Sequence, residues 1–521
     1  MLCESKGNLE SSFELTYQTK RQLTLIGFAL RRFASGLDYI IILPSLYFYL
    51  QSFNAKFYWL GLVIAADSLV AFFLSPLIDK LSEKWQRIRV LGFLANLIQI
   101  AGSMIYALPS HYFMPVVGRL VSGLGQSCSA AMYGEVKRVT SPEERNRVMI
   151  FMEGVRLFGV VIGPGMNFFL KDFDLRFGPW VIDHRTAPGF FMAIVWLLVE
   201  IVHIFTVYDL SLHPDAYRAL PEHDSEEDSA LYRAPTVSQP FTTHHELSPT
   251  RYEHKATFDE DEPKSEDDHT GSSDGEAKPS EEIRVLESEG DLGESTKHSR
   301  PASRSRKLQE KPAMNQSICQ LLCRRDVIVI LICQFLMFFN QTAFETLMLL
   351  IGVDKLGFGI RVLSAIFIGA GVEMVTVIVV VWSANKALDA KYLLITSLSA
   401  ALLASFARLA VGFAGNTNRM GCIVMTVLMG FFTIIGTPIA SISGKSLLPK
   451  LTPPETHPFY QSAFSISQHL GLIVGPLVAS VMYGHLVLFS ALTIAVFLII
   501  YLLLLPTMEK IQFPAHGCGT T

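Results

Sequence analysis

Long apolar runs alternate with short polar stretches along this chain, and one much longer polar segment divides the runs into two groups. Runs near the roughly 20 residues that cross a bilayer precede that segment at about 23–50, 57–78, 88–108, 111–133, 147–170 and 188–208. Six more follow it at about 326–351, 361–383, 392–413, 420–444, 460–482 and 484–506. The pattern predicts an all-α membrane protein with twelve transmembrane helices, arranged six plus six.

Five parts of the chain follow from these runs. We expect a cytosolic N-terminal tail (1–22), an N-terminal six-helix bundle (23–208) and an acidic cytosolic loop (209–325). A C-terminal six-helix bundle (326–506) and a cytosolic C-terminal tail (507–521) follow. The acidic loop carries 25 acidic and 15 basic residues and shows no apolar periodicity, so it is expected to be disordered. A flexible tether and a docking element remain alternative roles for it.

Composition and charge support a membrane protein with an internal N-terminus. Half of the residues are apolar and only 17% are charged, which is unusual for a soluble enzyme of this length. No cleaved signal peptide is expected, because about 22 polar residues precede the first run. The short loops on one side hold twelve Lys and Arg residues against seven on the other. This bias predicts that both termini and the acidic loop are cytosolic.

An internal duplication carries the fold prediction further. Residues Thr140 to Pro164 align without gaps with Thr452 to Pro476, at an offset of 312 positions. The first copy begins TSPEE and ends GVVIGP, and the second begins TPPET and ends GLIVGP. The runs 147–170 and 460–482 are therefore predicted to be equivalent helices in two repeated halves, with a cavity between the halves.

Three short motifs resemble those of a known family. The run 118–125 (GRLVSGLG) resembles the RxxxGxG motif of the major facilitator superfamily, and 159–164 (GVVIGP) resembles its GxxxGP motif. The loop 75–84 (SPLIDKLSEK) resembles a reduced form of its GxxxDRxGRR motif. The resemblance implies the major facilitator fold, two pseudo-symmetric six-helix bundles, and transport by alternating access.

The same motifs assign gate and packing residues. Asp79 and Lys80 are the two positions that the loop motif keeps, and with Arg119 they are expected to act at a gate. Glycines at four-residue spacing let helices approach closely, and a proline after glycine loosens a helix where it must flex. We expect such packing or hinge roles for Gly123, Gly159, Gly163, Pro164, Gly471, Gly475 and Pro476.

A narrower resemblance concerns location. The stretches 43–50, 186–189 and 344–346 resemble a lysosomal branch of the superfamily, and 186–189 is also similar to plant vacuolar phosphate carriers. The resemblance implies a lysosomal or late endosomal membrane, with the plasma membrane as the alternative. Tyr217 followed three positions later by Leu220 has the form of an endosomal sorting signal, which a clathrin adaptor would bind, although such tetrapeptides also arise by chance.

Ionisable side chains inside the apolar runs are the candidate chemistry, since a bilayer interior disfavours them unless they are paired or hydrated. Asp38 and Glu345 lie mid-run in the first and seventh helices without a cation one turn away, and Asp67 is a weaker candidate of this kind. A carboxylic acid in an apolar environment favours its neutral form. We therefore expect these three carboxyl groups to serve transport or proton coupling.

The remaining intramembrane charges have simpler interpretations. Glu153 and Arg156 share a helix face at i, i+3 and are expected to form a charge pair, either structural or at a gate. Glu200 and His203 have the same spacing and are expected to form a satisfied polar patch. Three arginines are expected to extend toward the membrane surfaces: Arg31, Arg32 and Arg408.

Three functions remain open after this reasoning. A proton-coupled or facilitative carrier uses the buried carboxylates, an anion channel would use Arg119 and Arg156 to attract its ion, and a scaffold or receptor would act through the acidic loop. The expected partners are the lipid bilayer, a small solute or anion, and protons, with no nucleic acid and a monomeric chain. Because no phosphate-binding, metal-spaced or nucleophile motif is found, we expect neither an enzyme nor a cofactor.

Overall fold

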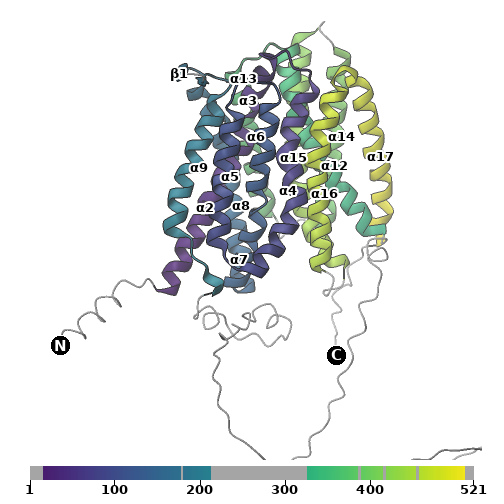
Figure 1. The fold of residues 1–521 in the computed structure, drawn as a ribbon. Helices are drawn as coiled ribbons and strands as arrows, with labels where there is room; N and C mark the ends of the chain where they lie inside the picture. The colour runs from purple at the N-terminus through teal and green to yellow at the C-terminus, as the bar shows by residue number, and fades with distance from the viewer. Residues whose placement is uncertain are drawn as a thin grey trace, which may run out of the picture. The chain divides into compact units, whose positions relative to one another are not determined.

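The computed structural model describes residues 16–177, 180–212, 325–384, 389–414, 418–452 and 457–510, all within one unit. Within these ranges the chain is helical apart from short connections and one hairpin, in which strand β1 (Leu175–Phe177) pairs antiparallel with β2 (Trp180–Ile182). The hairpin marks one end of the bundle, which we call the hairpin end. The opposite end, where the first helix begins and the last helix ends, we call the terminal end (Figure 1).

The N-terminal half contains the six predicted runs, two of which are broken. Its helices are α2 Tyr17–Ile41, α3 Leu43–Gln51, α4 Tyr58–Trp85, α5 Ile88–Tyr106, α6 Met114–Gln126, α7 Ser129–Val139, α8 Pro142–Leu170 and α9 Ala187–Thr206, followed by the 3-10 turn η1 Leu210–Leu212. The first run is bent by 42° between α2 and α3, where Pro44 lacks a backbone donor. The fourth run is divided between α6 and α7.

The C-terminal half contains the other six runs. They are α12 Arg325–Leu350 with its π-helical extension η3 Ile351–Lys355, α13 Ile360–Ala384, α14 Ala390–Ala414, α15 Arg419–Leu451, α16 His457–Val481 and α17 Leu486–Lys510, with the 3-10 turn η5 Met482–His485 before α17. Nine described stretches are apolar and long enough to cross a bilayer, one of them holding both α16 and α17, and the bent α2–α3 pair makes a tenth. The predicted all-α membrane fold is confirmed.

The repeated helices pack in equivalent ways within their halves. Helix α8 packs along α2 in the first half, and α16 packs along α12 in the second. A Cβ atom at Gly159 would overlap the carbonyl oxygen of Phe33, and a Cβ atom at Gly471 would overlap that of Phe335. The absence of a side chain thus lets each helix pair approach closely. These two glycines are 312 positions apart, the offset of the duplication.

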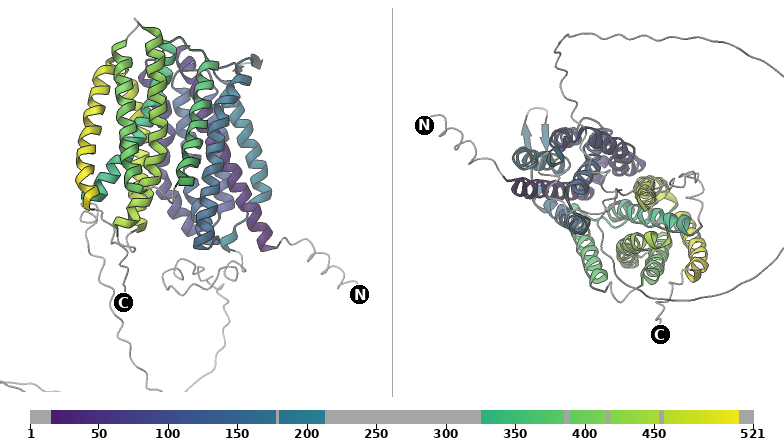
Figure 2. Two further views of the ribbon diagram at one scale, coloured as in Figure 1. Left: turned by 180° about the vertical axis from the view of Figure 1, so that it is seen from behind. Right: turned by 90° about the horizontal axis from the view of Figure 1, so that it is seen from below.

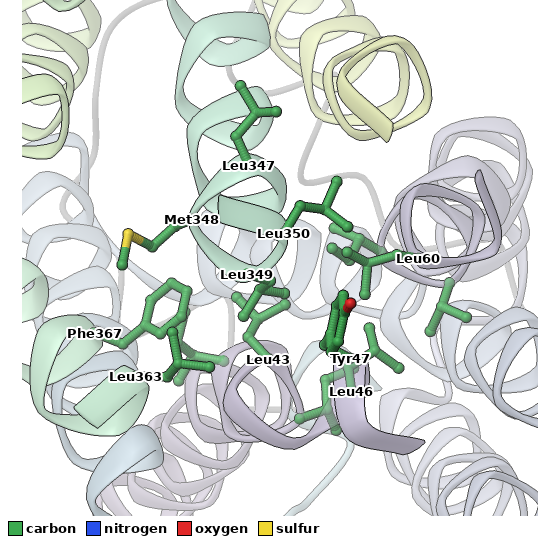
Figure 3. Close-up of a cluster of buried hydrophobic side chains, with 14 of the residues drawn as sticks. Leu43, Leu46, Tyr47, Leu60, Leu347, Met348, Leu349, Leu350, Leu363 and Phe367 are labelled. Atoms are coloured by element: carbon green, nitrogen blue, oxygen red, sulfur yellow. The ribbon is translucent and has the colours of Figure 1, made fainter. Parts of the chain in front are cut away.

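The two halves lie side by side, and they pack together through α4 with α16 and through α8 with α13 (Figure 2). Near the hairpin end they share one apolar core, in which Leu43, Leu46 and Leu60 of the first half pack with Leu350 and Leu363 of the second (Figure 3). Burial of these apolar side chains holds the halves together at this end.

Toward the terminal end each half has a separate core. Phe28, Ile88 and Ala131 belong to a cluster that lies wholly within the N-terminal half. Ile330 and Leu447 belong to a cluster that lies wholly within the C-terminal half. Among the described residues, the apolar core that joins the halves therefore does not extend through the terminal end.

Candidate transport site

The first buried charge cluster joins three helices of the N-terminal half. Arg119 in α6 donates hydrogen bonds of 3.1 Å to Oδ2 of Asp38 in α2 and of 3.1 Å to Oδ2 of Asp67 in α4. All three side chains are buried. One guanidinium faces two carboxylates, so full ionisation would leave an uncompensated negative charge in an apolar environment, which is costly. The cluster can therefore hold one proton without losing its ion pair.

Glycine positions this cluster. A Cβ atom at Gly123 would lie 2.7 Å from the carbonyl oxygen of Asp67, closer than real Cβ contacts allow. The bare glycine surface thus brings α6 against α4, one helical turn beyond Arg119. The motif residues Arg119 and Gly123 have complementary effects here, because the glycine provides the close approach that the arginine needs to reach Asp67.

Glu345 forms the second buried group, and it receives a hydrogen bond from the other half. Its Oε2 accepts a hydrogen bond of 2.7 Å from the hydroxyl of Tyr39, and its Oε1 accepts one of 3.1 Å from Nε2 of Gln341, one turn earlier on α12. No ion pair to Glu345 occurs among the described residues. Both of these partners are neutral. Tyr39 directly follows Asp38, so the two buried groups meet at consecutive residues of α2.

The charge pair predicted on the fifth span is present and has a third member. The Glu153 carboxylate forms an ion pair with Arg156 of the same helix, α8, at an N···O distance of 2.6 Å. It forms a second ion pair with Arg32 of α2 at 2.9 Å. The expectation that Arg32 extends to the membrane surface is therefore wrong. Its guanidinium also lies 5.4 Å from the ring centroid of Tyr133. The Glu153 carboxylate and the Tyr133 ring replace part of the hydration that a surface position would supply.

Arg31 and Arg408 also contradict that expectation, because both are fully buried. Arg31 donates to the Oδ1 atom of Asn96, and Asn96 donates a 2.7 Å hydrogen bond to Glu200. Arg408 donates to Asn340 at 3.1 Å and to the hydroxyls of Ser405 and Thr493. Acceptors from neighbouring helices hold both guanidinium groups inside the bundle. Glu200 thus belongs to a network, whereas Nε2 of His203 lies 2.9 Å from the carbonyl oxygen of Arg89.

The gate residues of the loop motif lie at the terminal end of α4. Asp79 is half-buried, Lys80 is exposed, and no ion pair to either occurs in the described part of the chain. An ion pair that sequence reasoning missed lies nearby, also at the terminal end. Glu135, fully buried at the end of α7, accepts from Arg138 at 2.9 Å and from the backbone N–H of Ser211 at 2.9 Å. The i, i+3 spacing of Glu135 and Arg138 was the available signal.

Other residues missed from the sequence are Tyr39 and Gln341. A tyrosine beside Asp38 and a glutamine one turn before Glu345 were visible signals, but neither indicates a partner by itself. The predicted sorting residues Tyr217 and Leu220 lie outside the described residues, as does the acidic loop between 213 and 324.

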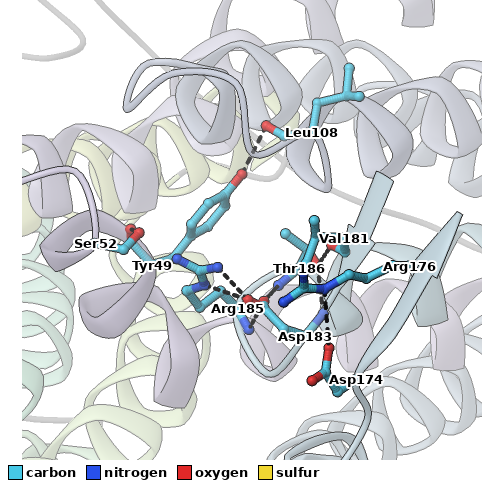
Figure 4. A network of polar contacts seen from close by, with 9 residues as sticks. All are labelled: Tyr49, Ser52, Leu108, Asp174, Arg176, Val181, Asp183, Arg185 and Thr186. Carbon is cyan, nitrogen blue, oxygen red and sulfur yellow. Dashed lines mark hydrogen bonds and ion pairs between the residues drawn. The ribbon is translucent and has the colours of Figure 1, made fainter. Parts of the chain in front are cut away.

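The loop after the hairpin is organised around Asp183 (Figure 4). Its carboxylate accepts from Nε of Arg185 at 2.6 Å and from the backbone N–H of Thr186 at 3.3 Å, while the Thr186 hydroxyl donates to the carbonyl oxygen of Val181 at 2.6 Å. Partial burial opposes ionisation, but the hydrogen bonds from Arg185 and Thr186 outweigh it and hold the pKa of Asp183 below its usual value. The start of α9 is thereby anchored by an ionised carboxylate.

Comparison with solved structures shows which fold this arrangement belongs to. The D-xylose-proton symporter aligns with a TM-score of 0.58 and 13% identity, covering 97% of this chain and 100% of that chain. A bacterial homolog to the human lysosomal transporter Spinster, in an inward-facing and unoccupied conformation, aligns with a TM-score of 0.59 and 10% identity, covering 95% and 99%. At these identities the likeness concerns the fold.

The relatives found by sequence match only part of this chain. The synaptic vesicular amine transporter of Homo sapiens is 26% identical over 168 residues, 31% of this chain and 30% of that protein. Multidrug resistance protein 2 of Bacillus subtilis is 21% identical over 197 residues, 38% of this chain and 46% of that protein. The matches thus span less than half of these relatives. The family model of the Major Facilitator Superfamily matches residues 28–444. The chain is an integral multi-pass membrane protein and belongs to the Major Facilitator Superfamily.

Proposed function

We propose that the protein moves a small solute across an endolysosomal membrane by alternating access of its two halves, coupled to protons. The observation that carries this proposal is that the two halves share an apolar core at one end of the bundle only. The shared apolar core lies near the hairpin end, whereas separate cores occupy the terminal end. Two bundles that pack together at one end and separate at the other can rock about a central site.

Buried carboxyl groups lie close to where the two halves meet, and this supports proton coupling. Glu345 has neutral partners, and Asp38 shares the single cation Arg119 with Asp67. A carboxyl group with neutral partners, or one that shares a single cation with a second carboxyl group, can accept a proton without leaving a cation unpaired. A proton loaded on one side and released on the other changes the relative stability of the two rocked states, and this difference lets a pH gradient drive the solute.

The contacts of Arg119 favour a carrier over an anion channel. Arg119 is paired with two carboxylates, and Arg156 is paired with Glu153 at 2.6 Å. The Arg119 guanidinium therefore offers no net positive charge to a permeating anion, whereas Glu153 balances only one of its two arginines, Arg156 and Arg32. The scaffold alternative depends on the acidic loop, of which residues 213–324 lie outside the described part of the chain.

The endolysosomal location rests on resemblance. The stretches Leu43–Leu50, Thr186–Gly189 and Phe344–Thr346 resemble major facilitator superfamily domain-containing protein 8, a lysosomal membrane protein. The segment with Tyr217 and Leu220 adds a candidate sorting signal on the side that the charge bias assigns to the cytosol.

Reconstitution into liposomes tests the transport proposal. Metabolite profiling of organelles that lack the protein would supply candidate solutes, and uptake of each would be measured at matched and at opposed pH. A carrier shows saturation and counterflow, and a proton-coupled carrier accumulates solute only with the pH gradient. Current without counterflow would instead establish a channel, and no movement of any accumulated metabolite would contradict transport.

A further inference from the structure

The ion-paired residues Arg32, Glu153 and Arg156, which we call the basic trio, carry one positive charge in excess. One carboxylate serves two guanidinium groups, at 2.9 Å and 2.6 Å. Among the described residues, no second acid lies within ion-pair distance of either arginine. None of the three belongs to the groups proposed above for proton coupling, so the excess charge has no role yet.

The basic trio lies on the side of the N-terminal half that faces the other half. Arg32 and Tyr39 are seven residues apart on α2, so they share one face of the helix two turns apart. The Tyr39 hydroxyl reaches Glu345 of α12, and this face therefore points toward the C-terminal half. Arg156 is also one of the charged side chains close to the Tyr39 hydroxyl. The trio thus lies beside the contact between the halves, on its terminal side.

The side chains of the trio are accessible although they lie within membrane helices. Arg156 is 29% exposed and Glu153 is 43% exposed. Val160, one turn after Arg156 on α8, belongs to the apolar core that both halves share. From Arg156 toward the terminal end, the described residues form a separate core in each half. The other half therefore does not cover the trio.

The C-terminal half has neutral amides at the positions equivalent to the two arginines. Arg156 and Gln468 are 312 positions apart, which is the offset of the duplication. Arg32 and Gln334 each directly precede the phenylalanine whose carbonyl oxygen the repeated glycine approaches. The duplicated helix pairs thus place two arginines in one half and two glutamines in the other.

These glutamines contact one another as the members of the trio do. Nε2 of Gln468 lies 3.4 Å from Oε1 of Gln334 and donates a 3.2 Å hydrogen bond to the hydroxyl of Ser441. The counterpart of Glu153 at the same offset is Ser465, which is exposed. The described contacts of this pair include no charged group, so it does not balance the positive charge of the trio.

The free hydrogen-bonding capacity on the two sides differs in kind. Nε of Arg32 has no acceptor among the described residues, and a guanidinium can bind both oxygens of a carboxylate. Gln468 is half-buried, and its amide acts only as a donor in its described hydrogen bonds. Its carbonyl oxygen can therefore accept from a hydroxyl or an N–H group of a solute. One side suits a negative charge and the other a neutral polar group.

We propose that the transported solute is a small organic acid with one carboxylate, which pairs with Arg156 and Arg32 while a hydroxyl or amide group of the solute meets Gln468. The single excess charge of the trio matches a monocarboxylate. A halide ion can pair with the arginines but has no group for the amide side. The inference rests on the proposed transport function and specifies its substrate class.

An exchange assay with unidentified solutes tests the charge of the substrate. Small molecules extracted from the organelles would be separated by anion exchange into an anionic pool and a pool of neutral and cationic solutes. Each pool would be offered to liposomes that contain the full chain and are preloaded with the same pool, at matched pH, and mass spectrometry would follow the exchange. We expect exchange of members of the anionic pool that carry one carboxylate.

Two variants of the trio separate charge from folding. Arg156→Gln loses a charge-assisted hydrogen bond, so exchange of these acids below saturation should fall about tenfold or more. Glu153→Gln removes the competing carboxylate, so it should lower the half-saturating concentration. Both variants break the same ion pair, and a merely structural role would impair both. Arg176→Gln, at a 77% exposed position of β1, is the matched control and should exchange as the wild type does.

Three outcomes would overturn the inference. Exchange confined to the neutral and cationic pool, or equal impairment of Arg156→Gln and Glu153→Gln, would exclude an anionic substrate at the trio while transport itself stands. A chloride current without exchange of any organic acid would establish a channel. Absence of exchange from both pools, with no current, would contradict the transport function and this inference with it.

Discussion

The hydroxyl of Tyr39 in α2 donates a 2.7 Å hydrogen bond to Glu345 in α12, and so joins the two halves through residues 306 positions apart. The bond is stronger when Glu345 is ionised, because charge-assisted hydrogen bonds exceed neutral ones. Protonation of Glu345 would therefore weaken a contact that crosses between the halves. Since Tyr39 follows Asp38, the same segment of α2 is also tied to Arg119.

Removing the titratable group at position 345 should remove the pH response. Glu345→Gln imitates the protonated acid, so solute exchange should continue while accumulation no longer depends on the pH gradient. The measurement is vesicle uptake at matched and opposed pH. Tyr39→Phe, which deletes the hydrogen bond between the halves and keeps the carboxyl group, should weaken the response without abolishing it. A Glu345→Gln protein with the full wild-type response would show that the proton is carried elsewhere.

A substitution of Asp38 by asparagine should change the pH response less than Glu345→Gln does, because Arg119 pairs with Asp38 at 3.1 Å.

Arg119→Gln leaves Asp38 and Asp67 buried without a cation, and breaking such a buried pair costs about 3 kcal/mol or more. We expect a lower unfolding temperature of the purified protein, partly restored when Asp67→Asn is added, because one carboxylate then no longer needs a partner. An Arg119→Gln protein as stable as the wild type would argue against the ion pairs.

Close packing of α16 on α12 should make Gly475 intolerant of a side chain. A Cβ atom there would overlap the Thr342 hydroxyl and lie 2.6 Å from the carbonyl oxygen of Phe339. Gly475→Ala should therefore destabilise the protein by about 1–3 kcal/mol, measured as a loss of folded protein in detergent on heating. Gly369→Ala is the control, since a Cβ atom at that helical position meets no atom within 4 Å. Equal losses in both variants would contradict the packing argument.

The anchor at Asp183 predicts a pH dependence of stability. The pKa of Asp183 is lowered by folding, so its contribution to stability is present above the unfolded pKa of about 4 and is lost as the pH falls through the lower folded value. Asp183→Asn should lower the unfolding temperature at pH 7, and the difference from wild type should shrink below about pH 4. Asp174→Asn, at an exposed position just before the hairpin, should have no measurable effect. A difference that persists unchanged at low pH would exclude this linkage.

The sorting prediction concerns the acidic loop. Changing both Tyr217 and Leu220 to alanine should move steady-state protein toward the cell surface, as measured by surface biotinylation and microscopy. Tyr232→Ala is a suitable control, because Pro235 rather than a bulky apolar residue stands three positions after Tyr232. A double variant with the same distribution as the wild type would reject the motif.

The sequence by itself determined which parts of the chain lie in the membrane and how the two halves are related. A bilayer interior offers no hydrogen-bond partners to the backbone, so apolar runs such as 188–208 must be helical, and α9 is. The pairing of Glu153 with Arg156 was equally predictable, since residues three apart on a helix are neighbours whatever surrounds them.

Only the tertiary structure decided which partners the remaining charged side chains have. The pairing of Arg119 with Asp38 and Asp67 needs three helices, and the bond from Tyr39 to Glu345 needs both halves. Whether a long side chain such as that of Arg408 reaches the membrane surface or stays inside depends on the acceptors that other helices present to it. Those acceptors are distant in sequence, and the local pattern around an arginine contains no information about their positions.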